Sequence, residues 1–223
     1  MSINLRNLIA AASIAAVLPG SLVSAGTYST SFENPPFTTG SINGQDGWSA
    51  TNANLDQEVV DNVAHSGTQS WRHSNAVTTG SFGDQPISAP LSGGDTVGET
   101  SSGANHGSHS YSVWFRAADT AGPDGSFLSL SLTDAPGSRI NYIGLENIAN
   151  DGISVITYDV TSNGPGNAVT FNQYDVTGGN FLSRTDWHRL TVNTTFVDGP
   201  ANDSVEILLN GASVGTIGSW EDY

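Results

Sequence analysis

The amino-acid sequence of 223 residues predicts an all-β protein built as a two-sheet antiparallel sandwich. Beyond residue 26, many segments alternate apolar and polar residues, which is the pattern of strands with one buried face. Clusters of Gly, Asn, Asp and Pro separate these segments, and glycine alone accounts for 26 residues. No long stretch has the apolar spacing of an amphipathic helix. About ten strands with short polar turns favour a jelly-roll sandwich.

Residues 1–25 have the features of a secretory signal peptide rather than of a folded element. Arg6 precedes an apolar run at Leu8–Leu18, and Val23–Ala25 supply small residues at a cleavage site. The apolar run is too short to span a bilayer, which takes about 20 residues. We therefore expect secretion, with residues 26–223 forming one β-sandwich domain. A secreted chain without cysteine is typical of bacteria rather than of eukaryotes.

The expected strands follow from the alternation, taken in chain order. Segments Gln57–Val63 and Thr68–His73 flank a turn at residues 65–67, so we expect them to pair as a hairpin. Asn210-Gly211 predicts a second tight hairpin, because both central residues of such a turn need a positive φ. The expected strands are 27–33, 57–63, 68–73, 110–117, 126–133, 139–146, 152–158, 168–174, 187–196, 204–209 and 214–217.

One of these strands, at residues 110–117, alternates with particular regularity. Tyr111, Val113 and Phe115 share one face, which we expect to be buried. Trp114 and Arg116 share the opposite face. Large aromatic residues beside turns pack into cores more often than they bind ligands. The tryptophans expected in the core for this reason are Trp48, Trp71 and Trp187.

Two regions depart from the strand pattern. Ser74–His109 is rich in small polar residues and contains little besides Ile87–Leu91 that could pair, which is typical of functional or mobile loops. Residues 220–223 follow directly on the last expected strand. We therefore expect the chain to be a fragment without its closing strand. The alternative is a sandwich that ends there with an open sheet edge.

The charge and cysteine content exclude several partners and chemistries. The chain has 6 basic and 21 acidic side chains, and its formal charge is −15. Nucleic acids and anionic membrane surfaces both require a basic face, so we expect neither as a partner. The absence of cysteine excludes disulfides, thiol catalysis and thiolate metal sites.

The sequence contains no convincing catalytic pattern. Glycoside hydrolysis needs two carboxyl groups about 5–10 Å apart, and the glutamates here are isolated from one another. Gly211–Gly215 has the spacing of a nucleophile elbow but follows a hairpin turn instead of leading into a helix. His106 and His109 have no third ligand in the sequence pattern that would make a zinc site. A carboxyl pair assembled from different strands remains the alternative.

The candidate ligand-binding residues are aromatic and polar side chains on expected exposed strand faces. Sugars stack their C–H faces on aromatic rings, and their hydroxyl groups bond to Arg and Asn side chains. Trp114 and Arg116 share such a face. We expect Arg139, Asn141 and Tyr158 to join them if their strands are neighbours in the sheet.

Several short motifs resemble those of known protein families. Phe32-Glu33-Asn34, Gly44–Trp48 and His65–Trp71 resemble the opening of secreted bacterial jelly-roll proteins. Asp186–His188 and Val205–Gly211 resemble the concanavalin A-like lectin/glucanase superfamily, with its laminin-G-like members. These families contain carbohydrate-binding modules, lectins, glycan hydrolases and lyases. The resemblance therefore implies a concanavalin A-like sandwich whose partner is an extracellular polysaccharide or other glycan.

The resemblance also implies a structural calcium ion, which takes oxygen ligands. In similar jelly-roll binding modules, the glutamate of the Phe-Glu opening and a Ser-Gly turn contribute to such a site. By position, Glu33 is the side-chain ligand, Ser66 and Gly67 are carbonyl donors, and Asp46 is a further candidate. Some members end in a sorting tail. The given sequence contains no such tail, which either argues against surface sorting or indicates a member truncated at its C-terminus.

These observations predict a secreted carbohydrate-binding or cell-surface-associated protein without catalytic activity. One alternative is a glycan-degrading enzyme, either a hydrolase or a lyase, of the same superfamily. A second alternative is a structural extracellular protein that self-associates through its sheet edges. The low charge density, the glycine-rich composition and the open final strand favour that alternative.

Overall fold

The computed structural model describes residues 28–74, 84–89, 107–117, 127–132, 139–161, 169–197 and 202–220. Every regular element in these ranges is a β-strand, as the sequence predicts. Within the same ranges there is no helix long and apolar enough to cross a membrane. The predicted signal peptide and most of Ser74–His109 lie outside the described residues.

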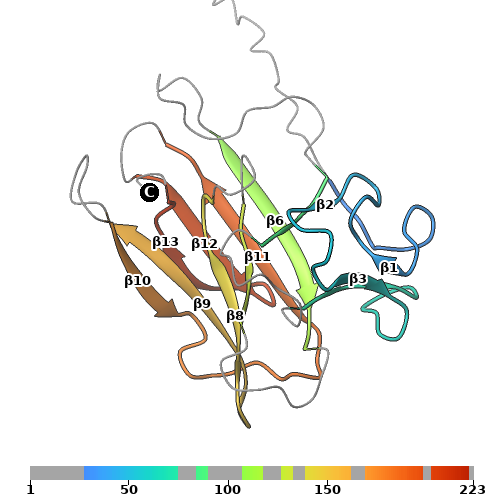
Figure 1. The fold of residues 1–223 in the computed structure, drawn as a ribbon. Coiled ribbons are helices and arrows are strands. Elements are labelled where there is room, and N and C mark those ends of the chain that lie inside the picture. The colour runs from blue at the N-terminus through green and yellow to red at the C-terminus, as the bar shows by residue number, and fades with distance from the viewer. Residues whose placement is uncertain are drawn as a thin grey trace, which may run out of the picture.

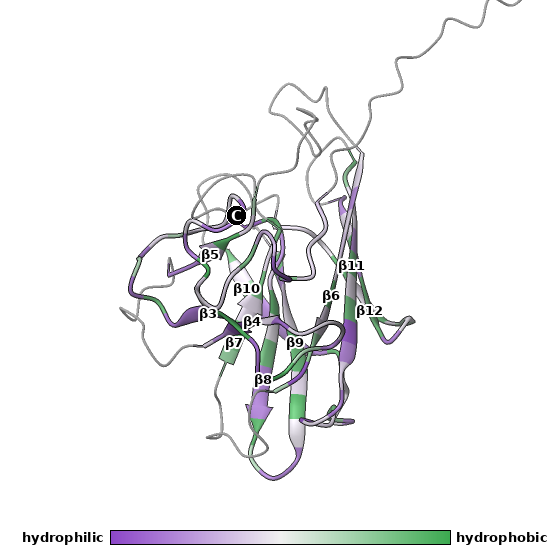
Figure 2. Cartoon of the chain, turned by 90° about the vertical axis from the view of Figure 1, so that its right-hand side faces the viewer, coloured by the Kyte–Doolittle hydropathy of each residue, from purple (hydrophilic) through white to green (hydrophobic). Residues whose placement is uncertain are grey.

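Two four-stranded antiparallel sheets form the main body of the molecule, and Figures 1 and 2 show them as two layers. The β9 sheet has the order β10 (Thr170–Asp175), β9 (Gly152–Thr161), β8 (Ile143–Ile148) and β7 (Phe127–Leu130). The β11 sheet has the order β13 (Ala212–Ile217), β12 (Ser204–Leu209), β11 (His188–Thr195) and β6 (Ser108–Phe115).

Alternate apolar side chains of both sheets fill the space between the layers. Ile143 and Val155 of the β9 sheet belong to the same buried cluster as Leu190 and Val192 of the β11 sheet. The predicted inward face of β6 packs against this cluster, so the alternation at that strand is confirmed. The structure is therefore a two-layer antiparallel β-sandwich. The other buried members of the cluster are Val205, Ile207 and Leu209.

The N-terminal strands form a smaller unit, which lies beside β6 in Figure 1. β1 (Gly40–Ser41), β3 (Gln57–Val60) and β4 (Ser70–His73) make a three-stranded antiparallel sheet, and β2 (Ser49–Ala50) pairs with β5 (Pro86–Ile87). This unit has its own apolar cluster of Phe37, Ile42, Trp48 and Val59, against which Trp71 packs. The core positions predicted for these two tryptophans are therefore confirmed.

Both predicted hairpins are present, but the first predicted strand is not. Strands β3 and β4 pair around the expected turn, and Asn210 and Gly211 have φ values of 52° and 86°. Residues 28–33, by contrast, form no strand. Phe32 has a φ of 63°, and its backbone N–H donates to the Thr30 hydroxyl at 3.1 Å. This local turn interrupts the extended backbone that the alternation at residues 27–33 predicted.

Candidate functional site

The structure distributes the five predicted ligand-binding residues over two sheets. Trp114 lies on β6 and Arg116 directly follows that strand, so both belong to the β11 sheet. Tyr158 lies on β9, and Arg139 and Asn141 precede β8, so these three belong to the β9 sheet. The alternation predicts which face a side chain occupies, but it does not show which strands are neighbours.

Asn141 is fully buried between the two layers. Its Oδ1 atom accepts a hydrogen bond from the Leu132 N–H at 3.2 Å, and its Nδ2 atom donates to Thr194 Oγ1 on β11 at 3.5 Å. The amide therefore links the β9 sheet to the β11 sheet. Because its side chain has no exposed surface, it is not available to a ligand in this conformation.

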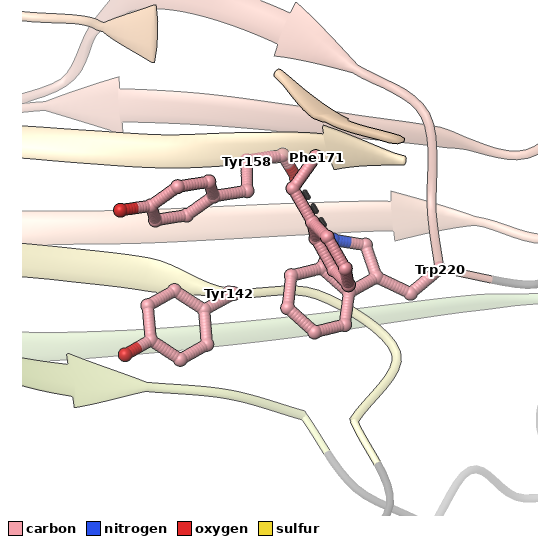
Figure 3. A pocket seen from close by; sticks show the side chains of 4 residues that line it. All are labelled: Tyr142, Tyr158, Phe171 and Trp220. Carbon is pink, nitrogen blue, oxygen red and sulfur yellow. Dashed lines mark hydrogen bonds between the residues drawn. The ribbon is translucent and has the colours of Figure 1, made fainter. Parts of the chain in front are cut away.

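An aromatic pocket lies on the outer face of the β9 sheet. Successive strand residues point to opposite faces, so Tyr158 and Val160 point away from the inter-sheet core to which Val155 belongs. The pocket has a volume of about 240 Å³ and is shown in Figure 3. Its lining residues are Tyr142, Tyr158, Phe171 and Trp220.

The rings of the aromatic pocket pack against one another in stacked and edge-to-face pairs. The Tyr142 ring is parallel to that of Trp220, with centroids 5.6 Å apart, and also to that of Phe127, with centroids 5.8 Å apart. Tyr158 meets Tyr142 edge to face at 5.5 Å, and Phe171 meets Trp220 in the same way at 5.3 Å. Both geometries are favourable for aromatic pairs, so the pocket is largely preformed.

Backbone hydrogen bonds fix Trp220 in the pocket. Its N–H donates to the Ile140 carbonyl at 2.8 Å, and its indole Nε1–H donates to the Tyr158 carbonyl at 2.8 Å (Figure 3). The Tyr158 hydroxyl donates to Gln173 Oε1 at 3.0 Å. Phe171 contributes an exposed ring edge to the pocket, with 43% of its surface accessible. The pocket thus offers apolar ring surface beside phenol and amide groups.

Arg139 lies next to this pocket through its contact with Tyr142. The guanidinium carbon is 6.0 Å from the centroid of the Tyr142 ring, which is within the range of a cation–π interaction. Burial raises the pKa of the Tyr142 phenol, against the opposing effects of Ser129 and Arg139. The phenol is therefore neutral at physiological pH. Of the predicted residues, Arg139 and Tyr158 are thus brought together at one site.

Trp114 lies on the outer face of the β11 sheet, where 45% of its surface is accessible. Its indole stacks on His65, with ring centroids 4.1 Å apart, and His65 meets Trp187 edge to face at 5.4 Å. Trp187, which was predicted to lie in the core, packs against none of the buried apolar clusters of the described residues. The buried position in the alternation is taken by His188 instead.

The predicted calcium ligand Glu33 accepts hydrogen bonds from the turn at residues 66–69. The backbone N–H groups of Thr68 and Gln69 and the Thr68 hydroxyl each donate to its carboxylate at 2.8 Å. These bonds, that from Gln69 foremost, lower the pKa of the carboxyl group. Gly67 has a φ of 72°, and a Cβ atom there would overlap with the Glu33 carboxylate. The structure therefore brings Glu33 and the Ser66-Gly67 turn together, as predicted.

The groups that face Glu33 are hydrogen-bond donors, whereas a calcium ion needs oxygen ligands around it. Asp46 is exposed in the turn before β2, with a φ of 43°. No cluster of three or more metal-ligating side chains occurs in the described ranges. Calcium binding therefore stays a prediction, and it would require these hydrogen bonds to be exchanged for metal contacts.

Three lining residues of the aromatic pocket, namely Tyr142, Phe171 and Trp220, were missed by the sequence reasoning. Tyr142 directly precedes β8 and Phe171 lies on β10, and both occupy outward positions, as Tyr158 does on β9. The signal that could have found them is this repetition of outward aromatic residues on strands that turn out to be neighbours. No family model, no curated protein and no solved structure matches the chain.

Proposed function

We propose that this protein is a secreted glycan-binding β-sandwich protein that holds sugar rings in the aromatic pocket without reacting with them. The observation that carries the proposal is the convergence of four aromatic side chains from four separate segments on one outer sheet face. Aromatic rings bind the apolar C–H faces of sugars by stacking, and neighbouring phenol and amide groups hydrogen-bond sugar hydroxyls.

The lining chemistry favours a neutral glycan. The four lining side chains are two phenols, a benzene ring and an indole, and the Tyr142 phenol is neutral because its pKa is raised. Pockets for small molecules usually measure about 300–1,000 Å³, so a pocket of about 240 Å³ suits a single sugar ring of a longer chain. Binding of this kind is shallow recognition of a polysaccharide segment.

The finer assignments of fold and location belong to the same proposal. The chain passes from β6 in one sheet to β7 in the other and returns from β10 to β11, which supports a jelly-roll sandwich of the concanavalin A-like kind. The signal-peptide pattern of residues 1–25 supports export from a bacterial cell. An extracellular polysaccharide is the corresponding partner.

The proposal is tested by affinity electrophoresis of the protein in gels that contain neutral polysaccharides such as xylan, mixed-linkage glucan or galactan. We expect at least one of them to retard migration, and Phe171→Ala to weaken that binding by about fivefold or more. Tyr174→Ala is the matched control, because Tyr174 is equally exposed on β10 but does not line the pocket.

Three outcomes would count against the proposal. Retardation that is equal in the Phe171→Ala protein and the unsubstituted protein would remove the pocket from the binding site. Release of reducing sugar from the bound polysaccharide would show an enzyme instead of a binding protein. Association of the protein with itself at rising concentration, independent of any glycan, would favour the structural alternative.

A further inference from the structure

The outer face of the β11 sheet carries a second group of aromatic and charged side chains. Antiparallel pairing places Trp114 of β6 directly opposite Arg189 of β11, and His188 opposite Phe115. If the same antiparallel pairing is extended by one residue beyond His188 and Phe115, Trp187 lies opposite Arg116. Residues that oppose each other across two antiparallel strands lie on the same face of the sheet. Two tryptophans and two arginines therefore alternate on one face, which we call the Trp–Arg face.

The contacts of His65 support this arrangement. Its imidazole stacks on Trp114 and meets the edge of Trp187, so both indoles border the same space. The inward residues of the same strand segments are Phe115 and His188, whose ring centroids are 5.9 Å apart. The Trp–Arg face is thus on the opposite side of the sandwich from the aromatic pocket.

Both arginines of the Trp–Arg face are anchored through Nε only. Arg189 Nε donates to Ser112 Oγ at 2.8 Å, and Arg116 Nε donates to the Ala117 carbonyl at 3.1 Å. Within the described ranges, their terminal nitrogens form no hydrogen bond and no ion pair, and Asp186 beside Trp187 pairs with neither. Arg72, by contrast, pairs with two carboxylates on the N-terminal unit.

Among the described residues, neither Arg116 nor Arg189 has a carboxylate partner, although the chain has a net charge of −15. Diagonal neighbours across two strands have Cα atoms about 7–8 Å apart, so the two long side chains can converge on one ligand. A guanidinium anchored at Nε presents its terminal N–H groups as a fork that matches the two oxygens of a carboxylate. An exposed indole beside this fork offers a surface on which a sugar ring can stack.

We infer that the Trp–Arg face binds carboxylate-bearing sugar residues, such as those of uronic-acid polysaccharides. The arginines pair with the sugar carboxylate, and the part of the Trp114 indole that His65 leaves uncovered contacts the sugar ring. Hydroxyl groups of Ser112 and Thr191, which hydrogen-bond each other at 3.1 Å on the same face, lie next to Arg189 and suit sugar hydroxyls. This site goes beyond the aromatic pocket, and it does not depend on whether the pocket binds a glycan.

The acidic character of the whole chain limits the length of the ligand. At physiological ionic strength, charges separated by more than about 8 Å are largely screened, so distant carboxylates do not prevent local pairing. A long and densely charged polymer would still be repelled by the rest of the surface. A short segment of acidic sugars is therefore the ligand that fits this face.

The test is titration calorimetry of the full chain with a short oligogalacturonate. We expect binding, with the affinity reduced by about tenfold or more in the double variant Arg116→Gln/Arg189→Gln. The Lys variants of both positions keep the charge but lose the fork, so their affinity should be intermediate. Arg72→Gln removes the same charge from the N-terminal unit, and we expect its affinity to stay within about twofold of the unsubstituted protein.

Comparison ligands separate this inference from its competitors. A neutral galacto-oligosaccharide should not bind to the Trp–Arg face, and a short oligoglutamate should bind more weakly because it offers no ring to Trp114. Measured in the Phe171→Ala protein, in which the aromatic pocket is disabled, binding of either ligand equal to that of oligogalacturonate would overturn the inference. An equal loss of affinity in the Arg72→Gln protein would overturn it as well. Phe171→Ala, which disables the aromatic pocket, should leave oligogalacturonate binding unchanged, so each site can fail separately. Thermal unfolding of every variant shows that it is folded.

Discussion

His73 ends β4 in a position where neighbouring side chains enclose its imidazole. Nδ1 is hydrogen-bonded to the Gln57 side chain, and the ring lies 5.2 Å from that of Trp71. Burial lowers the pKa of His73 from 6.5 to about 4, so the folded protein keeps this side chain neutral. The unfolded chain gains a proton below pH 6.5 that the folded chain does not gain, and stability is therefore lost as the pH falls from 6.5 towards 4.

We expect the His73 imidazole to reduce the free energy of unfolding by about 1–2 kcal/mol between pH 7 and pH 5. His73→Gln keeps a polar group next to Gln57 but does not titrate, so most of this difference should disappear. Urea unfolding of both proteins at the two pH values measures the effect. An identical pH dependence in the two proteins would show that His73 is not its source.

Single residues also show how far the sequence could be read. The outward positions of Trp114 and Arg116 were predicted correctly, because alternation along one strand is a local property. Asn141 has the same polar character in sequence, yet it is buried, since its place is decided by Leu132 and by Thr194 on a distant strand. A contact between residues more than 50 positions apart cannot be predicted from the local alternation of apolar and polar residues.

Among the individual strands, β8 shows how a glycine can shape the candidate site. Gly144 lies on the outer face of the strand, where a Cβ atom would overlap with the Phe127 ring and lie 2.9 Å from Ile156 Cγ1. Phe127 occupies this space and stacks on Tyr142, which lines the aromatic pocket. The absence of a side chain at Gly144 therefore holds the stacked rings in place.

Gly144→Ala should lower the free energy of unfolding by about 1–3 kcal/mol, because the added methyl group forces Phe127 to move. Glycan binding by the aromatic pocket should weaken in the same protein. The matched control is Gly215→Ala on β13, where the nearest atom would be 3.5 Å away, an ordinary contact distance. Denaturant unfolding measures both variants, and equal destabilisation by the two substitutions would contradict this account.

Most strands could be predicted from sequence, but their order in the sheets could not. The hairpin partners β3 and β4 follow one another in sequence, so their pairing is predictable. β6 pairs with β11, more than 70 residues further along, and this pairing is what assembles the Trp–Arg face. In the same way, Trp220 reaches the aromatic pocket only because the segment after β13 crosses to the β9 sheet.

At the scale of the whole molecule, the two layers are joined by apolar packing and by the buried amide of Asn141. Its hydrogen bonds to Leu132 and Thr194 satisfy polar groups that are inaccessible to water. Unpartnered polar groups in such a position cost more free energy than the net contribution of the hydrogen bond itself. The interface between the sheets is thus sensitive to changes at this one polar position.

Asn141→Leu should lower the free energy of unfolding by about 1–3 kcal/mol, because the Leu132 N–H and the Thr194 hydroxyl lose their partner. Adding Thr194→Val removes one of the two orphaned groups, so the double variant should lose less than the sum of the single variants. Chemical denaturation of the three variants completes a double-mutant cycle. Strictly additive losses would show that the two side chains do not interact across the layers.

The aromatic rings on the outer face of the β9 sheet have a consequence for colloidal behaviour. A protein with exposed apolar surface tends to self-associate, and a large net charge opposes this association because the molecules repel one another. The charge of −15 supplies that repulsion at neutral pH. Near the isoelectric point of about 4.2 the electrostatic repulsion between molecules vanishes, and the exposed aromatic surfaces of two molecules can associate. Acidity thus governs whether these molecules remain dispersed or coalesce.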